Sequence, residues 1–583
     1  MKTKATTGRR EKGMGDWQET GRTHSGRFTE LDADKLRGGY YTSGALAQWL
    51  CDWAIRSADD QVLEPSCGDG VFLDAAAKRL GVLGAQGPKR ANNILGIEIL
   101  ADAADMARER LRRQLGLRAG DAVETSDFFA WWQRPERPRF NAVVGNPPFI
   151  RYQSFPEPHR SRAMEIMKEL GLSPNRLTNI WVPFVVASAG CLRPGGRMAL
   201  VLPAELLQVS YAAQLRSFLT DRFGRIDLIA CNELFFERAE QEVILLLADD
   251  ARAAPSEENP CEVALTETGT VAEIIRHVPE EVLKGASPKT ICHDSEKWLK
   301  YFLSAAEIAF MRELRASDGA TSLSTFASVD VGVVTGKNEF FVLRQSEVDG
   351  RGLGSHTIPL VSRSAHLAGA RVSKRDWTRL AADDQRVHLL HLAPINGSKL
   401  APRLEQYVRL GEEQKVHKGY KCSIRTPWYA VPSVWIPDGF FFRQIYDFPR
   451  PVLNVAGATS TDTIHRLRCK TNPRSVIANL YTHLTAASAE IEGRSYGGGV
   501  LELEPTEAER LLVPGKLSPA LPVTECDRLV REGRLDDVLN ENDRLVLMDG
   551  IGLSRRDCQM LRSIWEKMRD RRLARRRVER RGS

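Results

Sequence analysis

Short apolar runs alternate with longer amphipathic stretches through the first half of the chain. The runs lie near residues 61, 94, 122, 141, 197, 226 and 243, with stretches of helical periodicity between them. Runs that are apolar throughout are typical of strands covered by helices on both faces. The pattern therefore predicts an α/β fold, a doubly wound and mostly parallel sheet of seven strands, over residues 36–250.

The pattern changes after residue 250. Residues 253–260 are rich in Ala, Pro, Ser and Glu, as in a linker or a peripheral insertion. Later apolar runs, such as 428–435 and 440–445, are short and broken by Pro, Gly and Asp, which predicts small antiparallel sheets. The predicted divisions are a flexible segment (1–35), the doubly wound domain (36–250), a linker and helical connection (251–320), a mixed α/β domain (321–515) and a helical, basic segment (516–583).

The apolar run at 140–144 ends in Asn146-Pro147-Pro148-Phe149. Two prolines restrict the backbone, so that the Asn146 side-chain oxygen and the Pro147 carbonyl can point at one small group. An exocyclic amine carries two hydrogens for these two acceptors, and Phe149 offers a flat face to the ring that bears the amine. The tetrapeptide indicates transfer to an amino nitrogen, with an ordinary Asn-Pro turn as the alternative.

A glycine-bearing loop follows the strand near residue 61, in the order Glu64-Pro65-Ser66-Cys67-Gly68-Asp69-Gly70. Such a loop lets a ligand lie against bare backbone at the start of the next helix. Leu73 occupies the place of the third glycine of the dinucleotide fingerprint, which disfavours NAD. A methionine-sulfonium nucleoside has no pyrophosphate to bind, so it remains a suitable ligand.

Two further acidic residues stand at predicted strand ends. Glu98 closes the strand near residue 94, where a carboxylate can accept both hydroxyls of a ribose. Asp127 and Phe128 follow the next strand and suit an adenine amine and an adenine face. The alternatives are a solvated helix cap for Glu98, and a strand end with core aromatics for Asp127 and Phe128.

The order of these motifs resembles that of S-adenosylmethionine-dependent DNA adenine N6-methyltransferases, specifically the gamma-class enzymes of type II restriction-modification systems. In that family the cofactor motifs come first, the Asn-Pro-Pro-aromatic motif follows, and the target recognition domain is C-terminal. The resemblance implies a class I methyltransferase domain over 36–250, a target recognition domain over 321–515, and S-adenosyl-L-methionine as the cofactor. It also implies double-stranded DNA as the partner and a functional pairing with a separate restriction endonuclease.

The resemblance extends to two other segments. Residues 38–42 look like the family's N-terminal segment over the methionine end of the cofactor, with Ser43 in place of a frequent proline. Residues 232–237 resemble the motif whose aromatic residue, here Phe236 or its neighbour Phe235, covers the flipped base. The implied catalytic residues are Asn146, Pro147, Pro148, Phe149 and Phe236. The implied cofactor-binding residues are Tyr41, Thr42, Glu64, Pro65, Ser66, Cys67, Gly68, Gly70, Glu98, Asp127, Phe128 and Pro148.

The substrate depends on the second half of the chain. Asn-Pro-Pro-aromatic also occurs in enzymes that methylate a protein glutamine or ribosomal RNA, but those enzymes need no large C-terminal reader. Aromatic and basic residues that could contact a duplex here are Lys421, Arg425, Trp428, Tyr429, Arg443 and Arg466, each with a structural alternative. Cytosine N4 enzymes usually have Ser at the position of Asn146, so adenine is favoured. A DNA-binding subunit with a degenerate methylase scaffold is the rival from another class.

Charge and cysteine usage complete the expectations. The net charge is +7, and residues 562–583 alone contain ten Lys or Arg against three acids. Arg575 to Arg577 suit phosphate contacts, with a solvated tail as the alternative. Ten cysteines without zinc-like spacing indicate reduced thiols and no metal site. The longest apolar stretch, 181–192, is too short to span a bilayer, and the reduced thiols predict a cytoplasmic protein. The resemblance to DNA methyltransferases implies a bacterial, nucleoid-associated one.

Overall fold

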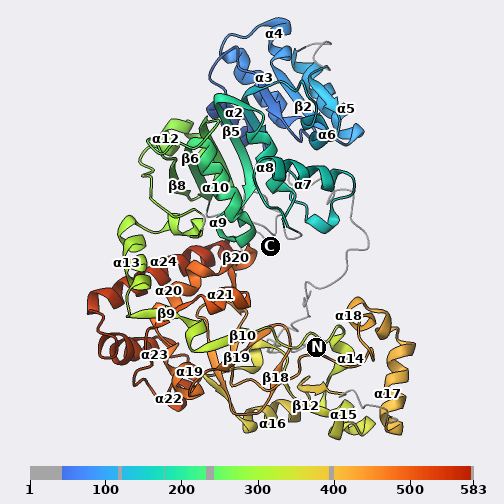
Figure 1. The fold of residues 1–583 in the computed structure, drawn as a ribbon, viewed down its shortest axis with the longest axis vertical. Coiled ribbons are helices and arrows are strands. Elements are labelled where there is room, and N and C mark those ends of the chain that lie inside the picture. Colours follow the sequence, from blue (N-terminus) through green and yellow to red (C-terminus); the bar gives the residue numbers. More distant parts are fainter. Residues whose placement is uncertain are drawn as a thin grey trace, which may run out of the picture.

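A large, mostly parallel sheet organises the first of two lobes (Figure 1). The computed structural model describes residues 42–115, 121–175, 178–231, 242–293, 295–392 and 400–579. Within these residues the strand order is β3-β2-β1-β4-β5-β7-β6-β8, and only β7 runs antiparallel to its neighbours. The strands are β1 Val62–Glu64, β2 Ile94–Glu98, β3 Val123–Thr125, β4 Phe140–Gly145, β5 Leu192–Pro203, β6 Phe223–Cys231, β7 Val243–Ala251 and β8 Glu262–Thr268.

Helices cover both faces of this sheet, as the apolar strands predict. Val143 of β4 belongs to one hydrophobic core and its neighbour Val144 to another, because successive strand residues point to opposite faces. One face is covered by α2 Gly44–Ala54, α3 Val71–Val82 and α5 Ala101–Leu115. The other is covered by α6 Phe128–Trp132, α7 His159–Glu169, α8 Trp181–Ala189 and α10 Ala213–Arg222. The predicted doubly wound, mostly parallel α/β sheet is confirmed.

The predicted number of strands is wrong, because the described sheet has eight strands instead of seven. The additional strand, β8, lies at the edge and pairs parallel with β6, from Arg225 opposite Glu262 to Cys231 opposite Thr268. It falls within the segment that was expected to be a linker. An edge strand is less covered by neighbouring elements than a central strand, so it carries more polar residues. It therefore lacks the continuous apolar run from which the other strands were predicted.

The second lobe contains small, mostly antiparallel sheets and a helical end, as predicted. Its sheets have the orders β10-β19-β15-β17-β13, β11-β14-β12-β18, β16-β21-β20 and β22-β9. The strands of these sheets include β9 Ala320–Ser322, β10 Ala327–Asp330, β11 Val342–Leu343, β12 Thr357–Val361, β13 Arg371–Val372, β14 His388–Leu390, β15 Gly439–Phe442, β16 Gln444–Ile445, β17 Pro451–Asn454, β18 Thr459–Ser460, β19 Ile464–Cys469 and β22 Leu512–Pro514. The strands used below are β20 Arg494–Tyr496 and β21 Val500–Glu502. The helices used below are α14 Asn338–Phe341, α15 Gln345–Arg351, α16 Lys374–Ala382, α17 Pro402–Glu413, α18 Tyr420–Ser423, α20 His483–Glu492 and α24 Arg555–Glu579.

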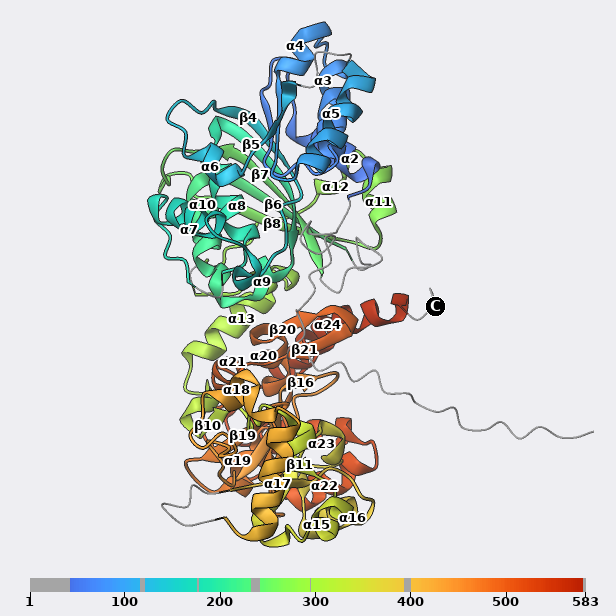
Figure 2. The same ribbon diagram turned by 90° about the vertical axis from the view of Figure 1, so that its right-hand side faces the viewer.

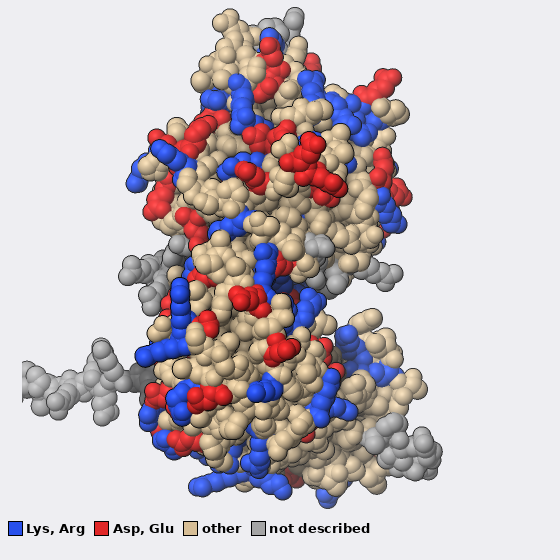
Figure 3. All heavy atoms as spheres, turned by 60° about the vertical axis from the view of Figure 1, so that its left-hand side comes forward, with Lys and Arg blue, Asp and Glu red and all other residues tan. Residues whose placement is uncertain are grey.

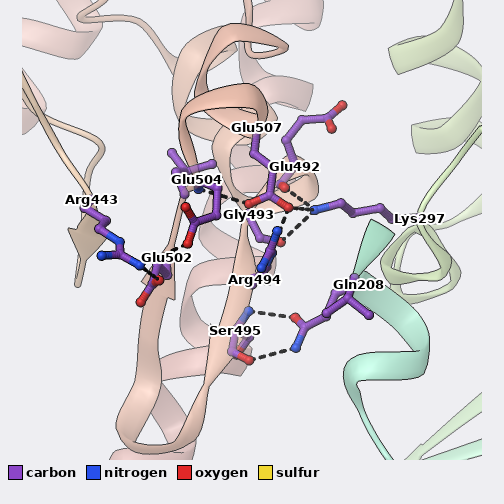
Figure 4. A network of polar contacts seen from close by, with 12 residues as sticks. Gln208, Lys297, Arg443, Glu492, Gly493, Arg494, Ser495, Glu502, Glu504 and Glu507 are labelled. Atoms are coloured by element: carbon purple, nitrogen blue, oxygen red, sulfur yellow. Dashed lines mark hydrogen bonds and ion pairs between the residues drawn. The ribbon is translucent and has the colours of Figure 1, made fainter. Parts of the chain in front are cut away.

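The carboxyl edge of the large sheet faces the second lobe. Helix α9 (Glu205–Gln208) follows the end of β5, and Gln208 exchanges two hydrogen bonds with the backbone of Ser495 in β20, at 2.9 and 2.7 Å (Figure 4). Lys297, from the connection between the lobes, pairs with Glu507 at 2.9 Å beside this contact (Figure 4). Strand ends of the first lobe therefore lie against the second lobe.

The first part of the basic C-terminal segment also joins the lobes. Arg571 of α24 pairs with Glu242 at 3.3 Å and with Glu267 at 2.6 Å, both at the carboxyl edge of the sheet. Arg572 is buried and pairs with Glu490 of α20 at 2.6 Å. These cations are therefore engaged within the protein instead of facing phosphates. The side chains of residues 575–583 lie outside the described part of the structure.

The surface carries both signs of charge. Figure 3 shows Lys and Arg intermixed with Asp and Glu over the face that it presents, as expected from a net charge of only +7. All ten cysteines fall in the described ranges, and each is a free thiol, as the sequence predicts. No helix in the described ranges is long and apolar enough to cross a membrane.

Candidate active site at the carboxyl edge of the sheet

Four motifs predicted from the sequence meet at one edge of the large sheet. Strands β3, β2, β1 and β4 are parallel neighbours, so their carboxyl ends lie side by side. Asp127, Glu98, Glu64 and Asn146 stand at or just beyond those ends. The structure therefore brings together residues that lie as far apart as 64 and 146 in the chain.

The loop after β1 is held in one conformation. Gly68 and Gly70 have φ angles of +52° and +81°, which side chains rarely allow, and a Cβ on Gly70 would lie 2.9 Å from the Cβ of Ala107. Arg110 of α5 donates to the carbonyl of Asp69 at 2.9 Å and to its carboxylate at 2.5 Å. The loop thus presents bare backbone at the start of α3, as the sequence predicts.

Glu64 is buried in the floor of this loop, at 2% exposure. Burial raises the pKa of its carboxyl group well above the ordinary value, and the nearby charges of Asp69 and Glu98 raise it further. Among the described residues, neither its Oε2 atom nor the hydroxyl of Ser66 has a hydrogen-bond partner. Buried polar atoms without partners are rare in native folds. A ligand with positive charge and hydrogen-bond donors would satisfy both groups.

Glu98 is held by the backbone and is not a solvated cap. Its two carboxylate oxygens accept the N–H groups of Gly68 and Leu100, each at 2.9 Å, and the residue is 8% exposed. A carboxylate has about four acceptor positions in all. The remaining positions can accept further donors, such as the hydroxyls of a ribose, without breaking these two bonds.

Asp127 and Phe128 differ in what they offer. Asp127 caps α6 by accepting the N–H of Phe129 at 3.1 Å, and His159 and Arg162 of α7 approach its carboxylate at 2.9 and 3.2 Å. The ring of Phe128 is 3% exposed and stacks on Phe184, with the ring centroids 5.4 Å apart. Phe128 is therefore a core aromatic residue, which was the alternative interpretation of the sequence. Its contact with adenine stays a prediction.

The Asn146-Pro147-Pro148-Phe149 turn is tied to neighbouring segments. The Asn146 amide nitrogen donates to the Thr42 hydroxyl at 3.3 Å, and Thr42 is itself buried. This bond orients the amide and links the turn to the predicted N-terminal segment. Phe149 is half-buried and packs against both hydrophobic cores of the lobe. Tyr41, Phe235 and Phe236 lie outside the described residues.

A polar cluster beside this edge was not predicted from the sequence. Asn179 donates to Glu205 and to the Tyr211 hydroxyl, each at 3.0 Å, and Tyr211 donates to Glu205. Burial raises the pKa of Tyr211, and Glu205 raises it further. Tyr211 also lines a cavity of about 230 Å³ with Met167 and Leu215. Nothing in the spacing of these residues along the chain signals the cluster.

Most of the second-lobe residues proposed to contact a duplex are engaged internally. Arg466 donates to the carbonyls of Val331 and Ser433, and Arg425 to those of Thr335 and Val334. Arg443 pairs with Glu502 and Glu504. Trp428 packs on Phe340 and donates to Glu412, and Tyr429 packs on Trp428.

The three arginines therefore have a structural role, which was the alternative to DNA contact. The two aromatic residues, Trp428 and Tyr429, pack against neighbouring side chains of the same lobe. Lys421 differs from the other five candidates, because its side chain is exposed on α18.

Two family models match the chain. Residues 92–233 match the Eco57I restriction-modification methylase, and residues 295–547 match the C-terminal domain of the type II methyltransferase M.Eco57I.

Two curated relatives cover most of the chain. Type II methyltransferase M.AccI of Acinetobacter calcoaceticus is 22% identical, over 82% of this chain and 86% of its own length. M.XamI of Xanthomonas campestris pv. amaranthicola is 23% identical, over 85% and 89%. Among solved structures, the type IIG restriction endonuclease BpuSI is similar over 94% of this chain and 66% of its own, with 13% identity and a TM-score of 0.38.

Proposed function

Because this chain belongs to the type II restriction-modification methyltransferases of the Eco57I family, we propose that it methylates the N6 amine of adenine in a duplex recognition sequence. The methyl donor is S-adenosylmethionine, and the modification protects host DNA from a cognate restriction endonuclease. One observation carries the proposal. The Asn-Pro-Pro-Phe turn stands at the same sheet edge as a buried carboxylate, Glu64, with an oxygen that no described residue satisfies.

The residues around the glycine loop fit the cofactor. S-adenosylmethionine supplies an electrophilic methyl group on a sulfonium that is itself positively charged. Glu64 and Ser66 provide the polar groups that lack partners in the described structure, and Gly68 and Gly70 leave the loop backbone open to a ligand. Glu98 stands at the end of the next strand, where it would accept ribose hydroxyls.

The turn after β4 would hold the reacting amine. An adenine inside the duplex cannot bring its amine to the sheet edge, so the base must leave the stack. The Asn146 side-chain oxygen and the Pro147 carbonyl would accept the two amine hydrogens, which draws the nitrogen lone pair out of conjugation with the ring. Phe149 would stack on the base, and Phe236 is proposed for its other side or edge.

Positioning and electrostatics carry the rate in this scheme. A neutral amide cannot take a proton fully, so the proton leaves the product amine after transfer, and no covalent bond to the protein forms. The residues that matter are those that hold the amine in line with the methyl group. The second lobe supports the choice of DNA, since a large C-terminal domain matches that of a type II methyltransferase.

Methylation-sensitive sequencing of DNA from cells that express the protein tests this function. The expected result is N6-methyladenine at one short recognition sequence, and its absence from cells that express the Asn146→Ala variant. Nucleoside analysis of the same DNA distinguishes adenine from cytosine as the target. Detection of N4-methylcytosine would contradict the choice of adenine as the target base. Transfer of the methyl group only to RNA or to protein would contradict the choice of DNA as the substrate.

A further inference from the structure

The second lobe exposes a cluster of apolar side chains around α18. Tyr420 is 74% exposed and Ile424 is 64% exposed, and they stand four residues apart, which places them on one side of a helical turn. Val334, from the neighbouring loop, is 37% exposed. Single exposed apolar residues are common, but a local group of large ones often marks a binding surface. We define the α18 patch as Val334, Lys337, Lys418, Tyr420, Lys421 and Ile424.

Internal contacts hold the α18 patch in a fixed shape. Arg425 donates from its guanidinium to the carbonyls of Thr335 and Val334, both at 2.8 Å. Gly336 has a φ of +88°, and a Cβ there would lie 3.0 Å from the Cβ of Lys421. The loop and α18 are therefore joined closely. A preformed surface loses less conformational freedom when it binds.

The charge around this patch is positive. From residue 415 to residue 425 the chain carries Lys415, Lys418, Lys421 and Arg425, with no Asp or Glu. In the described part of the structure, Lys415, Lys418 and Lys421 form no ion pair with a carboxylate. This contrasts with Arg443 and Arg572 of the same lobe, which pair with buried or half-buried carboxylates. Within the patch, Lys337 pairs with Glu339 at 3.0 Å, and the Lys421 ammonium lies 5.6 Å from the centroid of the Tyr420 ring. Exposed lysines without a carboxylate partner, next to exposed apolar side chains, suit double-stranded DNA, which carries phosphates outside and bases inside.

The position of α18 suits a partner that also reaches the first lobe. In Figure 1, α18 lies at the top of the right-hand part of the second lobe, on the side toward the first lobe, whereas α15 and α16 lie at the far end. Figure 2 shows α18 farther from the first lobe than β20, β21 and α24. The sheet edge that carries Asn146 also faces the second lobe, as the Gln208–Ser495 contact shows. A duplex bound at that edge would reach α18 by extending along the second lobe.

We propose that the α18 patch enters a groove of the duplex beside the target adenine and reads base identity. Tyr420 and Ile424 contact apolar parts of the bases, such as thymine methyl groups, and Lys421 donates to base-edge acceptors such as guanine O6 and N7. Lys415 and Lys418 contact phosphates, which position the patch without reading sequence. This inference rests on the proposed function, because it needs duplex DNA as the substrate.

The test compares sequence preference between variants of the full chain. Tyr420→Ala, Ile424→Ser and Lys421→Gln are each assayed for methylation of a library of duplexes that differ at every position of the recognition sequence. Discrimination at one or two positions is expected to fall by about tenfold or more, while methylation continues at the relaxed sites. The side chains are exposed, so the thermal unfolding midpoint should stay unchanged.

Two lysine variants serve as matched controls. Lys415→Gln should weaken binding to all duplexes alike and reduce the salt dependence of log affinity by about 0.9, because one phosphate is no longer neutralised. Lys374→Gln, on α16 at the far end of the lobe, should change neither sequence preference nor salt dependence.

The outcomes separate this inference from the proposed function. If the wild-type protein methylates adenine at one sequence and the three patch variants keep that preference, the inference is overturned and the function stands. If the wild-type protein methylates no duplex, the function itself fails. If the variants keep their DNA preference but no longer self-associate or bind another protein, the patch is a protein interface and the inference is again wrong.

Discussion

Two sets of buried polar side chains, one in each lobe, are used in opposite ways. In the first lobe, the described contacts leave Glu64 and Ser66 with buried oxygens that accept no hydrogen bond. In the second lobe, Arg466 and Arg572 are almost fully buried, and each donates several hydrogen bonds to carbonyls or carboxylates. Because leaving a buried polar group unpaired costs free energy, Glu64 and Ser66, which stand in the predicted cofactor loop, are candidates to bind a ligand. A saturated arginine, by contrast, supports the fold.

This difference decides which charged residues are candidates for function. Arginines are frequent in DNA-binding domains, and the sequence alone makes Arg425, Arg443 and Arg466 equivalent to Lys421. The structure separates them, since the arginines hold loops and strands together while the lysine is exposed. Among these groups, the exposed Lys421 is therefore the candidate for function in the second lobe, and the buried Glu64 and Ser66 are the candidates in the first.

The largest effect is expected when the buried ion pair between Arg572 and Glu490 in the second lobe is removed. Arg572→Ala leaves the Glu490 carboxylate buried without its partner, which should lower the free energy of unfolding by about 3 to 5 kcal/mol. Chemical denaturation measures this change. Arg556→Ala, at an exposed position of the same helix, is the control and should stay within about 0.5 kcal/mol of wild type. A decrease below about 1 kcal/mol for Arg572→Ala would mean that the pair does not support the fold.

In the first lobe, Asn146→Ala should remove activity and leave the fold intact. Removing one acceptor for the reacting amine is expected to lower the single-turnover rate about a hundredfold or more, with cofactor affinity largely unchanged. Asn146→Asp keeps an acceptor oxygen and should be milder. Near-normal turnover by the alanine variant would exclude this role for the side chain.

The sequence predicted much more of the first lobe than of the second. Strands β1 to β7 and the loop after β1 follow from apolar runs and glycines, which are local signals. The edge strand β8 was missed because half of its pattern is polar. The role of Arg466 could not be predicted, since it depends on a carbonyl of Val331 that lies 135 positions away. The Asn179, Glu205 and Tyr211 cluster was missed for the same reason, because folding alone brings its members together.

Glu98 tests whether a group with two backbone partners can still bind a ligand. Glu98→Ala should weaken S-adenosylmethionine binding by about 1.5 to 3 kcal/mol, because it removes a charge-assisted hydrogen bond to the ribose. Titration calorimetry gives the affinity. Glu109→Ala, on the exposed face of α5, is the control and should not change the affinity. Equal affinity for Glu98→Ala and wild type would assign the ribose contact to another residue.

Phe149 packs against both hydrophobic cores and is also proposed to stack on the target base. Its replacement can distinguish a loss of core packing from a loss of base stacking. Phe149→Ala should cost about 1 to 3 kcal/mol of base stacking, whereas Phe149→Tyr and Phe149→Trp should be far milder. The measurement is the rate on duplex DNA, with the unfolding midpoint followed in parallel because the ring packs against both cores. An alanine variant with an unchanged rate would leave the base without this stacking partner.

The smallest effect concerns proton release from Glu64. Burial raises the pKa of this carboxyl group, so in the free protein it stays protonated over a pH range in which an exposed glutamate is ionised. The folded state then binds more protons than the unfolded state in that range. The free energy of unfolding therefore falls as the pH rises from the ordinary pKa towards the raised one.

A cationic cofactor reverses this preference, because its charge favours the ionised carboxylate and lowers the pKa of Glu64 again. Binding therefore releases a proton, and affinity should rise by at most about tenfold per pH unit above the ordinary glutamate pKa, then level off near the raised value. Calorimetry in two buffers of different ionisation enthalpy measures the released proton. In Glu64→Gln both the proton release and the pH dependence should disappear. If they persist in that variant, the unsatisfied oxygen of Glu64 is not where the positive charge binds, and the contrast between the two lobes loses its main support.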